Sequence, residues 1–183
     1  MLEDSIIQQL TPKEESGTAG TAPIQGILGG DELKNLRNHF KEEELCDLAR
    51  VLGEKLPDSK WFVNGLLDQF FTPAAHPTPE EYKQAAIQRE SQLITLFLVF
   101  SHGQGIFLGI HFYWGLMMGL SPEDLSRHVM LVGMYGGIQL LNAALTTLER
   151  TLNLLKRLAW SNNPIPGEVV REIEGGLGPP LNK

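Results

Sequence analysis

One long uncharged stretch constrains the fold of this chain more than any other feature. Residues 93–120 contain no Asp, Glu, Lys or Arg, and a helix of that length would cross a bilayer. Ser-His-Gly-Gln-Gly at 101–105 interrupts the stretch, leaving pieces of roughly ten to fifteen residues that are each too short to span. No basic cluster at either end sets an orientation. We therefore expect no membrane span but apolar helices that are enclosed by protein on every side.

Apolar residues recur at helical spacing along most of the chain, and no stretch alternates as a strand would. Thr78-Pro79-Glu80-Glu81 and Ser121-Pro122-Glu123-Asp124 are helix starts, because each combines a capping hydroxyl, a proline in the first turn and an acidic side chain three residues after the cap. These patterns predict an all-α fold. The expected helices cover residues 32–56, 61–71, 78–100, 106–118 and 122–158, the last of them loosened near Gly133, Gly136 and Gly137.

Composition divides the chain into three parts. Residues 1–30 are rich in Thr, Ser, Gly and Pro and predict a flexible lead-in that docks through Ile24, Ile27 and Leu28. Residues 31–160 are expected to form the helical domain. Residues 161–183 contain several prolines and glycines and predict an irregular tail.

Charge and cysteine content exclude several classes of function. The chain has 15 basic and 22 acidic residues and a formal charge of −7, which argues against binding to nucleic acid or to an anionic membrane. Its single cysteine, Cys46, excludes an intramolecular disulfide, a redox pair and a cysteine-rich metal cage. The N-terminal residues are acidic where a signal peptide would be basic, so we expect a cytoplasmic protein.

Residues 92–148 carry a recognisable order of motifs. An apolar helix is followed by a helix with one histidine, His111, and then by Gly119-Leu120-Ser121-Pro122-Glu123-Asp124, a glycine bend at Tyr135-Gly136-Gly137, and Asn142-Ala143-Ala144. This order resembles the core of the carboxymuconolactone decarboxylase and alkylhydroperoxidase D group. The resemblance implies an alkylhydroperoxidase D-like helical bundle that assembles as a homo-oligomer, a trimer or higher.

The peroxidase branch of that group has a C-x-x-C-x-x-x-H motif and a glutamate on the preceding helix. Counted back from His111, the cysteine positions hold Gln104 and Phe107, and the glutamate position holds Gln92. Glu90 lies two residues from Gln92 and is expected to face elsewhere on the helix. The resemblance therefore implies a cysteine-less member, without thiol peroxidase activity.

His111 is the candidate catalytic residue, because an imidazole can give or take a proton near neutral pH. Gln104, Phe107, Trp114 and Gln92 are the expected substrate-binding residues, and the two glutamines are the candidates to fix the histidine tautomer. The expected activity is proton-transfer, lyase or isomerase chemistry on a small, mostly apolar molecule.

A second interpretation treats His111 as a core histidine whose nitrogens are satisfied by backbone or by Gln104. Phe112, Tyr113, Trp114, Met117 and Met118 are then packing residues, as such clusters more often are. On that interpretation the protein is a non-catalytic, oligomeric binding or scaffold module on the same fold.

No metal or cofactor is expected. His102, His111 and His128 match no local ligand spacing, and no carboxylate joins them in the apolar stretch. Gly103-Gln104-Gly105 lacks the Lys and Ser/Thr of a phosphate loop. The expected partners are further copies of the chain and a small-molecule ligand. Residues 93–120 predict the self-association, since a small domain has little interior in which to hide them.

Overall fold

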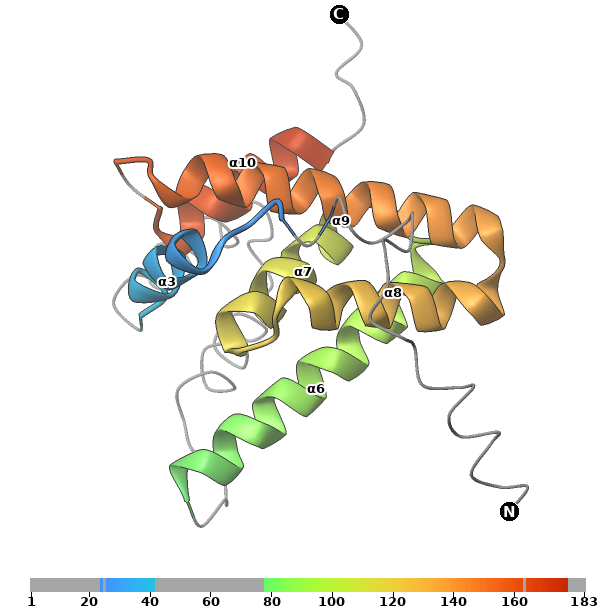
Figure 1. Ribbon diagram of the computed structural model, residues 1–183, viewed down its shortest axis with the longest axis horizontal. Coiled ribbons are helices and arrows are strands. Elements are labelled where there is room, and N and C mark those ends of the chain that lie inside the picture. The colour runs from blue at the N-terminus through green and yellow to red at the C-terminus, as the bar shows by residue number, and fades with distance from the viewer. Residues whose placement is uncertain (1–23, 25, 42–77, 163, 178–183) are drawn as a thin grey trace, which may run out of the picture.

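The computed structural model describes residue 24 and residues 26–41, 78–162 and 164–177 (Figure 1). Within these ranges the chain forms helices and turns and no strand, which confirms the all-α class. None of the described helices is both long enough and apolar enough to cross a membrane. Cys46 and the helix expected over 61–71 lie outside the described residues. The helices are α3 (Gly30–Asn38), α6 (Pro79–Phe100), α7 (Ile106–Met118), α8 (Pro122–Gly136), α9 (Ile138–Ala159) and α10 (Pro166–Leu177).

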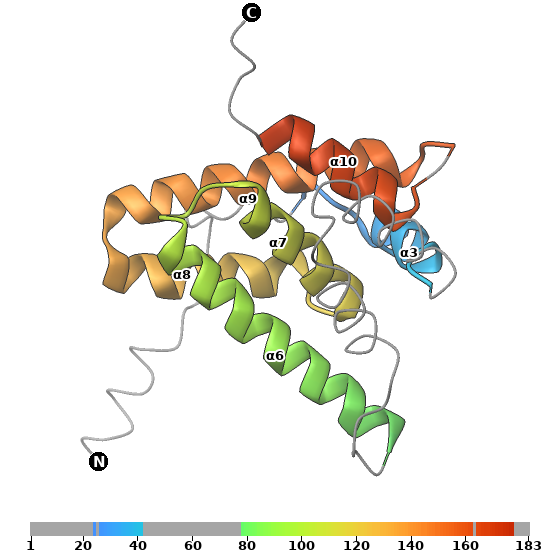
Figure 2. The same ribbon diagram turned by 180° about the vertical axis from the view of Figure 1, so that it is seen from behind.

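Helix α7 lies at the centre of the fold. Helices α8 and α9 form an antiparallel pair, α6 crosses on one side, and α3 and α10 pack near the C-terminal end of α9 (Figures 1 and 2). Helix α7 contacts α3, α6, α8, α9 and α10, and its ten residues 108–117 are all buried. The expectation of an enclosed apolar helix is confirmed, and the neighbours that enclose it belong to the same chain.

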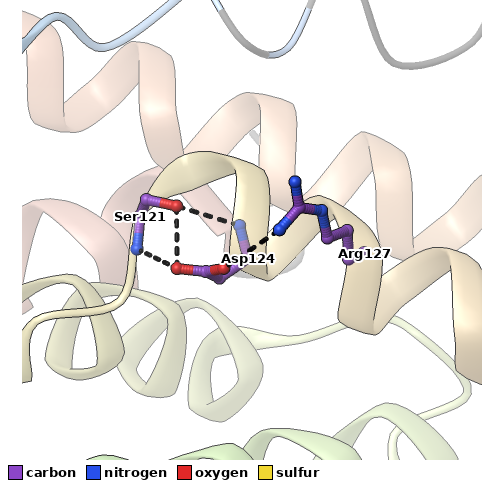
Figure 3. Close-up of polar contacts among 3 residues, drawn as sticks. All are labelled: Ser121, Asp124 and Arg127. Carbon is purple, nitrogen blue, oxygen red and sulfur yellow. Dashed lines mark hydrogen bonds and ion pairs between the residues drawn. The ribbon is translucent and has the colours of Figure 1, made fainter.

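The two predicted helix starts are present. The hydroxyl of Thr78 accepts a hydrogen bond from the Glu81 amide at 3.2 Å, at the start of α6. At the start of α8 the Ser121 hydroxyl accepts from the Asp124 amide at 3.1 Å, and the Asp124 carboxylate accepts from the Ser121 amide at 2.9 Å (Figure 3). Each cap satisfies amides that the first helical turn leaves unpaired.

We expect Ser121→Ala to lower the free energy of unfolding by about 1 kcal/mol at neutral pH, because it removes a helix cap. The Ser121 amide, and then its hydroxyl, lower the pKa of Asp124 from its ordinary value of 3.8. A carboxyl with a lowered pKa stabilises the fold above its ordinary value, and this contribution is lost as the pH falls through the lowered pKa. Urea unfolding of the parent protein at neutral pH and below about pH 3 should show this loss. Asp124→Asn lacks the carboxyl group, so its free energy of unfolding should fall by less over the same pH range. An equal acid response in Asp124→Asn contradicts the assignment.

Two expected boundaries were wrong. The helix predicted over 32–56 ends at Asn38, because the chain turns at His39 and brings Phe40 edge-on to Tyr113, with 5.9 Å between the ring centroids. The part of that prediction that covers residues 42–56 lies outside the described residues. The predicted irregular tail instead contains α10. Its first residue is Pro166, a position where proline starts a helix rather than breaking it. Val169, Val170 and Ile173 then form a fully buried stripe.

Other expectations agree with the structure. The lead-in docks through Ile24 and Leu28, which are buried, and Ile27, which is partly buried against the core. Helices α6 and α7 have the predicted extents. The predicted loosening after Gly133 is a complete break at Gly137, whose φ of 91° ends α8 and starts α9.

Candidate functional site

His111 lies in the middle of α7 and turns its ring toward α6. Its Nδ1 atom is 2.6 Å from the Oε1 atom of Glu90. Both residues are buried, with 7% of His111 and 2% of Glu90 exposed. A carboxylate that is removed from water in this way is costly unless a close partner compensates it. The two side chains therefore form one structural unit, which we call the Glu90–His111 dyad.

The partner of the histidine differs from the one expected. Glu90 belongs to the buried stripe of α6, in which Ala86, Glu90, Ile94 and Leu98 follow each other at intervals of four residues. Gln92 is rotated by about 200° from Glu90 around the helix axis and is exposed. The expectations that Glu90 faces away from His111 and that Gln92 or Gln104 fixes the histidine tautomer were wrong. The signal that could have found Glu90 is a single charge in an otherwise apolar four-residue repeat.

Aromatic rings enclose the dyad. The Phe97 ring stacks on the imidazole, with 4.4 Å between centroids and 23° between planes. Trp114 meets the imidazole edge-on at 5.2 Å. The Phe107 ring stacks on the Phe97 ring, with 6.2 Å between the ring centroids, and 62% of Phe107 is exposed. Of the expected substrate-binding residues, Trp114 therefore touches the histidine and Phe107 lies one ring further out.

The two glutamines do not join this group. Gln104 is exposed in the turn between α6 and α7. Gln92 lines a surface hollow of about 330 Å³ on α6, together with Ala85, Gln88 and Arg89. We expected both residues near His111 from their separation along the chain. That separation does not determine the direction in which each side chain points.

The larger aromatic cluster is core packing, as the second interpretation expected. Phe112 and Tyr113 are fully buried, and Met117 is nearly so. Burial raises the pKa of the Tyr113 phenol, and its hydroxyl has no hydrogen-bond partner within the described part of the chain. Arg37 fixes the end of α7, because its guanidinium donates to the carbonyl oxygens of Leu116 and Leu120 at 2.8 and 3.1 Å.

The dyad assigns different roles to the two imidazole nitrogens. An ionised carboxylate only accepts hydrogen bonds, so Nδ1 carries the proton when it faces Glu90. The lone pair of a neutral imidazole is then on Nε2, and no hydrogen-bond partner for Nε2 occurs among the residues that the structure describes. This arrangement can accept a proton at Nε2 while Glu90 stabilises the resulting imidazolium.

Neither a metal site nor a known relative adds to this picture. In the described ranges, no three His, Cys, Asp or Glu side chains gather as metal ligands would. Comparison of the chain with protein-family models, with curated proteins and with solved structures gave no significant match. The candidate site therefore depends on the geometry of Glu90, His111 and the surrounding rings.

Proposed function

We propose that the protein is a non-redox enzyme, similar to the carboxymuconolactone decarboxylase group, with His111 as its general acid and base. The observation that carries this proposal is the buried contact of 2.6 Å between His111 and Glu90. The reaction class is proton transfer, as in a lyase or isomerase, on a small and mostly apolar molecule. Glu90 is a positioning residue, because it acts on the substrate only through the imidazole.

The surroundings of the dyad support this chemistry. Phe97 and Trp114 flank the imidazole, and these rings favour an apolar substrate over a charged one. A positioned histidine contributes typically 10²–10⁴-fold to a proton transfer. Glu90 contributes by holding the tautomer that leaves Nε2 free to react.

A panel of small enol lactones and their acids tests the proposal. Deuterium exchange, ring opening and loss of carbon dioxide are followed by NMR with the full chain. We expect turnover of at least one compound, a fall on the order of 10²-fold or more in His111→Ala, and a smaller fall with an altered pH profile in Glu90→Gln. Gln92→Ala is the matched control on α6 and should retain the parent rate. Equal rates in the parent and His111→Ala contradict the proposal.

The alternative is a non-catalytic binding or scaffold protein. It is favoured by the complete burial of Phe112 and Tyr113 and by the Phe97 ring lying over one face of His111, since both observations describe packing. On this alternative the dyad is a structural pair. It is then expected that no compound in the panel reacts and that His111 can be replaced together with Glu90 without loss of binding or assembly.

We predict that the protein does not reduce hydroperoxides by thiol chemistry. Gln104 and Phe107 occupy the positions of the two cysteines, and neither side chain can form a thiolate that is oxidised and recycled. A dithiol-dependent peroxidase assay should give the same background rate for the parent and for Cys46→Ser. Turnover that Cys46→Ser abolishes contradicts this prediction.

A further inference from the structure

Large apolar side chains are exposed at one end of the molecule. Nine described large apolar residues are exposed, and eight of them belong to the C-terminal part of α6, the first turn of α7, and the region around the turn from α8 to α9. The ninth, Trp160, follows α9 at the far end of that helix. We call the eight residues the apolar end: Leu96, Val99, Phe100, Phe107, Leu131, Met134, Tyr135 and Ile138.

The segments that carry the apolar end are held together. The turn after α6 packs on the first turns of α9, where the Thr147 hydroxyl donates to the Gly103 carbonyl at 2.8 Å. Helix α6 also contacts α8. Both ribbon views show the C-terminal end of α6 beside the turn that joins α8 and α9 (Figures 1 and 2). The exposed side chains therefore share one end of a connected structure.

The spacing of these residues is that of a helix face that packs on another protein element. Leu96, Val99 and Phe100 follow the i, i+3, i+4 pattern on α6, and Leu131, Met134 and Tyr135 follow the same pattern on α8. Ile138 is the first residue of α9, after the turn. The i, i+3, i+4 pattern marks the buried stripe of a helix. Here the stripes are exposed, with 74% of Phe100, 75% of Met134 and 87% of Tyr135 accessible.

We infer that the apolar end is the surface through which two copies of this chain associate. Residues 91–122 and 128–148, which carry it, contain no Asp, Glu, Lys or Arg. A charged ligand or an anionic membrane would find no opposite charge there. Two copies of these segments bring no like charges of their own together, although the chain carries a formal charge of −7 overall, and a two-fold interface pairs such a patch with itself.

The area of the apolar end fits this occupant. Eight side chains that are 48% to 87% exposed present on the order of 1,000 Å², since one large aromatic side chain carries about 150–250 Å². A stable interface buries about 800 Å² on each partner, whereas the largest apolar patch on a typical monomer is about 300–600 Å². The apolar end is therefore large enough for a dimer and larger than a monomer usually exposes.

The surface available for self-association differs from the one that the sequence predicts. The sequence pointed to the whole uncharged stretch 93–120, but the α7 part of it is buried inside one chain. The surface left for a partner is the end of α6 and the turn between α8 and α9. The inference concerns that surface alone, and it stands whether or not His111 is catalytic.

Sedimentation equilibrium of the full chain at micromolar concentration tests the inference. We expect the parent to have at least twice the chain mass of 20.3 kDa. Phe100→Glu and Met134→Glu, one substitution on each stripe, should both shift the mass to 20.3 kDa. Trp160→Glu is the matched control, because Trp160 is 64% exposed outside the apolar end, and it should keep the parent mass. Circular dichroism checks that each variant retains its helical content.

Three results would overturn the inference. The first is a parent chain that sediments at 20.3 kDa, which would mean that the apolar end is covered by another part of the same chain or by a different partner. The second is an oligomer that persists in both Phe100→Glu and Met134→Glu, which would place the interface elsewhere. The third is dissociation by Trp160→Glu to the same extent. Should one variant fail to fold, the other still decides, because each lies on a separate helix.

Discussion

Replacing His111 with leucine is expected to lower the free energy of unfolding by about 3–5 kcal/mol. The loss comes from Glu90 rather than from the histidine itself. Glu90 is 2% exposed, and its carboxylate has the His111 Nδ1 atom 2.6 Å away. Leucine fills much of the same volume, so the cavity is small, but it leaves a buried charge without its partner.

Replacing the other member of the dyad, Glu90, should lower the free energy of unfolding by less. Glu90→Leu leaves a neutral imidazole with an unpaired N–H group, which costs about 1–3 kcal/mol. The double variant Glu90→Leu/His111→Leu removes both polar groups, and replacement of a buried pair by apolar residues is often neutral or stabilising. We therefore expect the double variant to be more stable than His111→Leu alone.

Urea unfolding of the parent, the two single variants and the double variant measures this cycle. Glu90→Gln is the conservative control, because its amide oxygen can still accept from Nδ1. Additive losses, with the double variant the least stable of the four, would show that the two side chains do not depend on each other. The double variant also separates stability from activity, because it should be folded but should lack the proposed enzymatic activity.

The all-α class and the starts of α6 and α8 were predictable because local rules dominate them. Thr78 and Ser121 begin α6 and α8 as their capping patterns predict. The two failures have a common cause, since both depend on contacts between distant residues. Helix α3 ends where Phe40 turns to meet Tyr113, and α10 forms because Val169 and Ile173 find a buried surface. Propensity gives no information about such partners.

The candidate site was predictable only in part, for a similar reason. His111 was found because it is the one histidine in the apolar sequence of α7. Its partner was missed because a count along the chain selected Gln92, whereas burial selects the helix face that carries Glu90. The rings of Phe97 and Trp114 around the imidazole depend on how α6 crosses α7, which the turn between them determines.

The second large effect on stability is expected for Gly103→Ala, in the turn between α6 and α7. Helix α6 ends in a Schellman motif, in which the Gly103 amide donates to the Leu98 carbonyl at 2.9 Å and the His102 amide to that of Val99 at 3.3 Å. His102 has a φ of 52° and Gly103 a φ of 75°. The chain thereby reverses within a few residues and brings α7 back beside α6.

Gly103 has no room for a side chain. A Cβ atom there would lie 2.7 Å from the Leu140 carbonyl oxygen and 2.8 Å from the Ala144 amide nitrogen, and backbone atoms of a packed helix cannot move aside as a flexible side chain can. Backbone strain of about 1–3 kcal/mol adds to an overpacking cost of about 1–3 kcal/mol. We expect Gly103→Ala to lower the free energy of unfolding by roughly 2–6 kcal/mol in total.

Gly105→Ala separates the two contributions to this loss. Gly105 has a φ of 106° but nothing within 4 Å of its Cβ position, so the substitution should cost the backbone strain alone, about 1–3 kcal/mol. Urea unfolding of both variants gives the difference that is due to the contact with α9. Equal losses at Gly103 and Gly105 would mean that this contact does not hold the turn. A larger loss at Gly103 would mean that α9, through Leu140 and Ala144, sets the position of α7 and therefore of His111 relative to Glu90.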